Sequence, residues 1–136
     1  MNKTETLNWI HSFKAKGRQA DLKRMNWLLE KLGNPQTTFP AIHIVGTNGK
    51  GSTCSYLQHI LTASGYKTGS FTSPYITRFN ERIAIDGKEI SDQDLNKVIS
   101  LVKPIVESVT VETQYEKVTE FELVFLCLPI LHKSIL

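Results

Sequence analysis

The sequence predicts an α/β protein of the P-loop type, in which helices flank a parallel sheet to give three layers. A β-branched run at residues 42–45 leads into a glycine-rich turn and then a helical stretch, and a second short strand follows at residues 66–71. Two strands joined through a helix run parallel, with a right-handed crossover. The 136 residues, of which 40% are hydrophobic, suit one domain with its own core.

Two amphipathic helices are predicted before the first strand. Residues 4–13 place apolar side chains on one face, with Thr4 as the N-cap. Residues 21–32 form a stronger helical pattern, which Asp21 caps and Gly33 ends. The apolar faces are Leu7, Ile10 and Phe13 in the first helix, and Leu22, Met25, Leu29 and Leu32 in the second.

The turn after the first strand has the composition of a phosphate-binding loop. Three glycines leave room for backbone amides to converge on an anion, and the following helix adds its positive N-terminal end. Lys50 supplies a full charge, and Ser52 and Thr53 supply hydroxyls. The spacing departs from the standard pattern, because Ile44 stands where a glycine is expected and Gly51 follows the lysine. The alternative is an ordinary strand-to-helix turn with a solvated lysine.

The rest of the chain alternates helices with one hairpin. The helix after the turn is expected over residues 52–64, burying Tyr56, Leu57, Ile60 and Leu61. Residues 83–90 indicate a β-hairpin. Ser91 caps a helix that runs to about residue 109 and that Pro104 kinks or divides. A polar loop over residues 111–118 precedes a last apolar helix, broken by Pro129.

Composition and charge exclude several functional classes. The net charge is +3 with acids and bases interspersed, which predicts no nucleic-acid partner. The longest apolar run, residues 123–131, is far below the ~20 residues that span a bilayer, so no membrane role is expected. Two cysteines cannot build a secreted disulfide framework, and the N-terminus lacks a signal-peptide core, so the expected location is the cytoplasm.

The segment Gly46-Thr47-Asn48-Gly49-Lys50-Gly51-Ser52 closely resembles the ATP-binding loop of the folylpolyglutamate synthase and dihydrofolate synthase family, within the Mur ligase superfamily. The resemblance continues through residues 72–75 and 78–83 and covers most of residues 20–122. It implies that residues 1–136 are the N-terminal part of an incomplete Mur-ligase-like ATPase domain, and that the C-terminal glutamate-ligase domain is absent.

The resemblance also implies an activity. Members of this family are ATP-dependent ligases that add L-glutamate to a folate or dihydropteroate carboxylate through an acyl phosphate. ATP would be held by Gly46, Thr47, Asn48, Gly49, Lys50, Gly51, Ser52 and Thr53, with Lys50 as the catalytic cation. Mg²⁺ would be held by Ser73 and Glu122, with Glu120 as the substitute for the latter.

Several of these residues have structural alternatives. Ser73 could hydrogen-bond its own turn, and Thr119 and Glu122 form a capping box in the sequence. Thr119 and Phe121 match positions at the pterin end of the folate site, although core packing explains Phe121 equally well. Residues 18–24 are expected near the pteroate cleft or on a solvated face. Arg82 and Glu81 form either an exposed ion pair or a pair that orients the loop.

The sequence is consistent with two functional classes. Relatives in the family are much longer, and the tail after Glu122 departs from their pattern, most visibly at Pro129. A truncated form of the ligase is therefore expected. The alternative is a nucleotide-binding or partner-binding fragment without ligase activity, which self-associates through an exposed apolar C-terminal tail.

Overall fold

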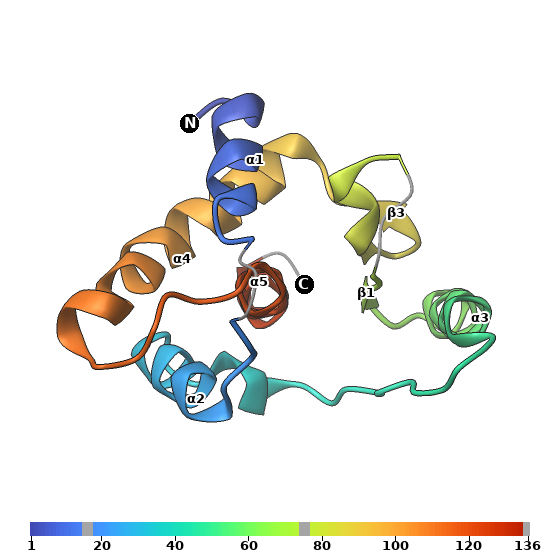
Figure 1. The fold of residues 1–136 in the computed structure, drawn as a ribbon. Helices are drawn as coiled ribbons and strands as arrows, with labels where there is room; N and C mark the ends of the chain where they lie inside the picture. The colour runs from blue at the N-terminus through green and yellow to red at the C-terminus, as the bar shows by residue number, and fades with distance from the viewer. Residues whose placement is uncertain (15–17, 74–76, 135–136) are drawn as a thin grey trace.

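The computed structural model describes residues 1–14, 18–73 and 77–134 (Figure 1). Pro74 and Tyr75 of the second motif and residues 135–136 of the tail lie outside the described residues. The elements are α1 (Lys3–His11), α2 (Leu22–Lys31), the short 3-10 helix η1 (Pro35–Thr38), α3 (Lys50–Ala63), β1 (Gly69–Phe71), the 3-10 helix η2 (Phe79–Arg82), β2 (Ile83–Ile85), β3 (Lys88–Glu89), α4 (Asp92–Glu112) and α5 (Glu120–Ser134).

The last helix forms the centre of the core. Figure 1 shows α5 surrounded by α1, α2 and α4, and it packs against each of them. Its buried side chains are Leu123, Val124, Leu126, Cys127, Ile130 and Leu131. The expectation that this tail is exposed is therefore wrong. Burial also raises the pKa of the Cys127 thiol to about 12, so this cysteine is a packing residue.

Neither proline interrupts its helix. Pro129 lies inside α5, which continues to Ser134, and Pro104 lies inside the undivided α4. Each proline removes one backbone hydrogen bond, a cost of about 3 kcal/mol in an isolated helix. Buried neighbours on both sides of each proline hold the helix together: Val102 and Val106 in α4, and Cys127 and Ile130 in α5. The predicted break at Pro129 is wrong.

Two of the helix starts predicted from capping residues are confirmed. The Asp21 side chain accepts a hydrogen bond from the Lys23 amide at the start of α2, and Ser91 accepts one from the Asp94 amide at the start of α4. The first helix begins earlier than predicted, with Asn2 rather than Thr4 as its cap. Leu22, predicted on the apolar face of α2, is exposed, and Leu28 is buried there.

The sheet differs from the prediction. The hairpin at 83–90 is confirmed, but β2 pairs antiparallel with both β1 and β3. Residues 42–45 form no strand, and Val45 is 75% exposed. A strand needs a neighbour to satisfy its backbone groups, and the described residues provide none for this segment. The predicted parallel crossover is therefore absent from the described residues.

The helix α3 lies apart from the helical core. In Figure 1 it follows an extended segment and contacts the rest of the molecule near β1. The Ser70 hydroxyl donates to Gln58 Oε1 over 2.8 Å and ties β1 to this helix. Tyr56 is 71% exposed, so the predicted burial of this helix face is wrong. No helix among the described residues is long and apolar enough to cross a membrane.

Candidate functional site

The glycine-rich turn has the backbone shape that its sequence requires. Gly49 adopts φ +76° and caps α3, which begins at Lys50. An L-residue with a side chain is strained at this dihedral angle, and glycine is not. Gly46 also has positive φ, at +153°. A methyl group placed at position 46 would lie 3.8 Å from Lys50 Cγ, so the stem of the lysine passes directly over the turn.

The turn presents unused hydrogen-bond donors. Residues 45–53 are exposed, and the first amide of α3 with a helical partner is that of Thr53, which donates to the Gly49 carbonyl. Hydrogen bonds between described residues leave the amides of residues 46–52 free. Lys50 forms no ion pair with any described acid. Free amides, a helix N-terminus and an ammonium group together suit a polyphosphate.

Ser73 lies two residues beyond β1 and is exposed. Its hydroxyl is 3.5 Å from Arg82 Nη2, the outer limit for a hydrogen bond, so it remains available to another ligand. Arg82 itself is buried and pairs with Glu120, with Nη1 3.3 Å from Oε1. Because Arg82 is buried and pairs with Glu120, the alternative of an exposed ion pair with Glu81 is wrong. Glu81 instead accepts hydrogen bonds from the amides of residues 77 and 78.

Glu122 forms a buried ion pair with Arg24. The guanidinium Nη2 lies 2.7 Å from Glu122 Oε1, and the two residues are 3% and 2% exposed. The same carboxylate oxygen accepts from the Thr119 amide over 2.9 Å, and the other accepts from the Asp21 amide over 3.1 Å. Both oxygens are thus bound by protein groups. The metal role of Glu122 stays a prediction, and it would require the carboxylate to leave Arg24.

Ionisation of Glu122 is favoured despite burial. Burial is the largest single effect and opposes the charge, but the hydrogen bonds from Arg24, Thr119 and Asp21 and the Arg24 charge together outweigh it. The pKa of Glu122 therefore lies below its ordinary value of 4.5. A lowered pKa in the folded state means that the unfolded chain binds the proton more tightly.

We expect the Glu122 pair to make folding acid-sensitive. Its contribution to stability is fully present above pH 4.5, the ordinary pKa of the group, and disappears as the pH falls through the folded-state value. Urea unfolding at pH 6 and pH 3 should show this loss. In Glu122→Gln the difference between the two pH values should be smaller, because the titrating group is gone. An unchanged difference in that variant would contradict the assignment.

Thr119 and Phe121 occupy different environments at the start of α5. Thr119 forms the capping box foreseen in the sequence, because its hydroxyl accepts from the Glu122 amide over 3.2 Å and its own amide donates to Glu122. Phe121 is 49% exposed, so it is not a core residue. Its ring meets Phe71 edge-on at 5.8 Å and stacks with Phe125 at 6.2 Å. An aromatic face next to β1 is thus left open to solvent.

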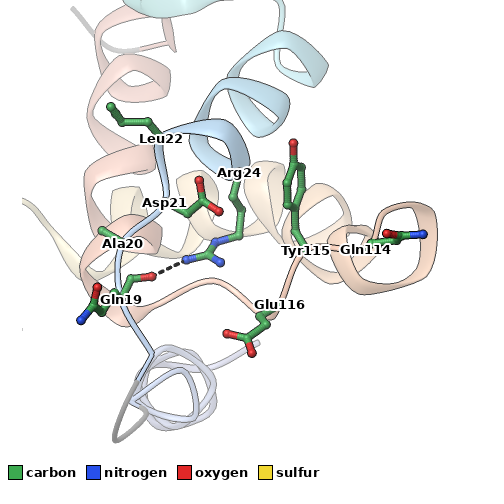
Figure 2. A pocket seen from close by; sticks show the side chains of 8 residues that line it. All are labelled: Gln19, Ala20, Asp21, Leu22, Arg24, Gln114, Tyr115 and Glu116. Carbon is green, nitrogen blue, oxygen red and sulfur yellow. Dashed lines mark hydrogen bonds between the residues drawn. The ribbon is translucent and has the colours of Figure 1, made fainter.

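A shallow cleft of about 710 Å³ lies between the start of α2 and the loop before α5 (Figure 2). Its walls are Gln19, Ala20, Asp21, Leu22 and Arg24 on one side, and Gln114, Tyr115 and Glu116 on the other. Figure 2 shows the Arg24 guanidinium reaching the Gln19 carbonyl, over 2.8 Å. Arg24 is committed to Gln19 and Glu122, so this part of residues 18–24 is not a solvated charged face.

The described residues contain no group of three or more His, Cys, Asp or Glu side chains placed to hold a metal ion. A magnesium ion that accompanies ATP keeps several waters and takes phosphate oxygens, so it needs few protein ligands. Of the two predicted metal ligands, Ser73 is the one whose oxygen is accessible.

Comparison with known proteins confirms the resemblance. No family model matches the sequence. The chain is 42% identical over 120 residues to a dihydrofolate synthase/folylpolyglutamate synthase of Bacillus subtilis, covering 88% of this chain and 28% of that protein. It is 44% identical over 124 residues to the folylpolyglutamate synthase (FPGS) of Lacticaseibacillus casei, covering 91% of this chain and 29% of that protein.

Solved structures of such enzymes share the fold. The apo form of L. casei FPGS matches with a TM-score of 0.88 at 41% identity, over 98% of this chain and 33% of that one. An FPGS–AMPPCP–folate complex matches equally well, with a TM-score of 0.88, 41% identity and the same coverage of both chains. FPGS of Mycobacterium tuberculosis, complexed with ADP and AMPPCP, matches with a TM-score of 0.86 at 29% identity, over 99% of this chain and 30% of that one. The chain thus spans about a third of these structures.

Proposed function

Since the chain is homologous to the folylpolyglutamate and dihydrofolate synthases over most of its length, we propose that it is the N-terminal part of the ATP-binding domain of such a ligase. The complete enzyme joins L-glutamate to the carboxylate of a folate or dihydropteroate through an acyl phosphate. It uses ATP and Mg²⁺ and works in the cytoplasm.

The observation that carries this proposal is the open turn at residues 46–52. Its amides are free of other described protein groups, and the Lys50 stem lies across Gly46. A phosphate chain in this turn would receive hydrogen bonds from the backbone and the charge of Lys50. Such preorganised donors stabilise charge that moves during phosphoryl transfer.

The remaining residues have defined roles in this proposal. Ser52 and Thr53 hold the phosphates from the first turn of α3, and Ser73 reaches the magnesium ion. Thr119 and Phe121 border the folate, Phe121 with its exposed ring face. Glu122 anchors α5 to α2 through Arg24 as long as that pair persists, and any metal role follows only after its release.

A competing function is a nucleotide-binding fragment without ligase activity. The two are separated by titrating the chain with Mg·ATP in a calorimeter and then measuring phosphate release with and without folate and L-glutamate. Binding of Mg·ATP with stimulated phosphate release supports the ligase. Binding without stimulation supports the fragment, and no binding of Mg·ATP contradicts both.

A further inference from the structure

One long stretch of the chain carries almost no charge. Between residues 32 and 66, Lys50 is the only lysine, arginine, aspartate or glutamate, although these residue types make up 21% of the whole sequence. Figure 1 shows an extended segment that leads from η1 to α3 along the edge of the molecule. We call residues 41–66, which comprise this extended segment, the glycine-rich turn and α3, the low-charge segment.

Large apolar side chains of the low-charge segment face solvent. Ile42, Val45, Tyr56, Ile60 and Tyr66 are each between 60% and 75% exposed. The structure describes every residue of α3, and none of them is buried. Clustered exposure of large apolar side chains marks surfaces that bind another molecule, and monomeric proteins usually protect such edges with charged residues. The low-charge segment therefore has the composition of an interface.

The backbone of residues 42–45 is also unpaired. Neither the amides nor the carbonyls of these residues form a backbone hydrogen bond with a described residue. The segment is rich in β-branched side chains, which favour a strand. An extended segment with free donors and acceptors is a template for pairing with another strand.

We propose that two copies of this chain associate through the low-charge segment, with residues 42–45 of the two copies pairing as strands. A twofold axis between the copies makes these strands antiparallel, and each strand supplies the donors and acceptors that the other lacks. Because two strands alone form a marginally stable pair, the exposed face of α3 adds apolar contact. Tyr56 and Ile60 lie on one face of this helix, four residues apart.

A second copy fits this surface better than a charged partner does. Lys50 follows the paired residues, so no like charges meet where the two strands pair. An acidic or basic partner would find no counter-charge along residues 42–45. The low-charge segment also matches in size the roughly 20–30 residues that each side of a standard interface contributes. The C-terminal tail, whose apolar side chains are mostly buried, offers no comparable surface.

Sedimentation velocity over a range of protein concentrations tests the association. The unmodified chain should change from the 15.4 kDa of one copy to twice this mass as the concentration rises. Ile42→Lys and Val45→Lys should each raise the dissociation constant of the dimer about 10- to 100-fold, because a charge replaces an apolar side chain that the dimer buries.

Val111→Lys is the matched control for these two variants. Val111 is an apolar residue of α4 that is 83% exposed, and Figure 1 shows α4 and α3 on opposite sides of α5. This substitution adds the same charge at a distant site, so it should change the dissociation constant by less than about twofold.

Hydrogen exchange of the unmodified chain gives a second measurement, which does not depend on any variant folding. Alternate amides of residues 42–45 should be protected at concentrations where the dimer predominates, because they donate across the strand pair. The same amides should exchange freely on dilution, since they have no backbone partner among the described residues of one copy.

Several results would overturn this inference. They are a mass of one copy at every concentration, a dimer that Ile42→Lys and Val45→Lys leave intact, and amides of residues 42–45 that show no protection in the dimer. Open-ended aggregation, or an equal loss of association in Val111→Lys, would also contradict a twofold contact through these residues. A monomer that binds Mg·ATP would leave the proposed function standing, whereas a dimer that does not bind Mg·ATP would contradict the nucleotide site alone.

Discussion

Arg24→Met is expected to lower the free energy of unfolding by about 3–5 kcal/mol. The substitution leaves the Glu122 carboxylate buried without its counter-ion, and α5 loses its charged link to α2. The ion pair itself contributes less than this to the free energy of unfolding, because most of the loss is the penalty for leaving a buried charge unpaired. Urea unfolding followed by circular dichroism at pH 7 measures the change.

Two further variants make this expectation specific. Glu112→Gln breaks the ion pair between Glu112 and Lys31, two side chains that are about half exposed. This substitution should lower the free energy of unfolding by less than about 1 kcal/mol. The double variant Arg24→Met/Glu122→Leu removes both charges and should recover much of the loss. If Arg24→Met costs no more than Glu112→Gln, the pair does not anchor α5.

Lys50→Ala is expected to weaken Mg·ATP binding strongly and, in a complete ligase carrying this loop, to reduce turnover by about 10²- to 10³-fold. Lys50 is the only lysine of the turn, and no described acid competes for its charge. Removing one preorganised donor at a site of developing charge has effects of this size. Calorimetry gives the affinity, and phosphate release gives the turnover.

Lys67→Ala is the matched control, because Lys67 is exposed and follows the other end of α3. Lys67→Ala should leave the Mg·ATP affinity and the turnover within about twofold of the unmodified protein, as expected for a solvated surface charge far from the turn. Near-normal turnover in Lys50→Ala would remove this lysine from the mechanism. Equal losses in both lysine variants would indicate a general electrostatic effect of net charge.

The sequence predicted those parts of the fold that short-range chemistry determines. Asp21 and Ser91 cap helices that begin where the sequence indicated, and the turn at Asp86 and Gly87 closes the predicted hairpin. In each case the donor and acceptor lie within a few residues, so the local pattern contains the whole interaction. The capping box of Thr119 and Glu122 belongs to the same class.

The prediction failed where a segment depends on distant partners. The β-branched run at residues 42–45 has strand propensity, but a strand forms only beside another, and no described segment pairs with it. The predicted apolar face of α3 is uncovered for the same reason, since the sheet expected beneath it is absent from the described residues. Tyr56 and Ile60 are therefore exposed.

In the candidate site, too, the interactions within a short segment were predictable, and those between distant segments were not. The loop glycines and Lys50 lie within six residues of one another, and their composition after a β-branched run identified them. The partner of Glu122 is Arg24, 98 residues away, and no local pattern indicated it. Glu120 lies beside Arg82 and His11, which come from distant parts of the chain, and no local pattern indicated that these three residues meet.

The most direct test of the nucleotide site is to follow the backbone amides of the ¹⁵N-labelled chain by nuclear magnetic resonance while Mg·ATP is added. We expect the largest shifts on residues 46–52, because their free amides receive the phosphates, and we expect Lys50→Ala to reduce these shifts greatly. Shifts concentrated on residues 19–24 and 114–116 of the cleft, with residues 46–52 unchanged, would contradict a nucleotide site at the glycine-rich turn.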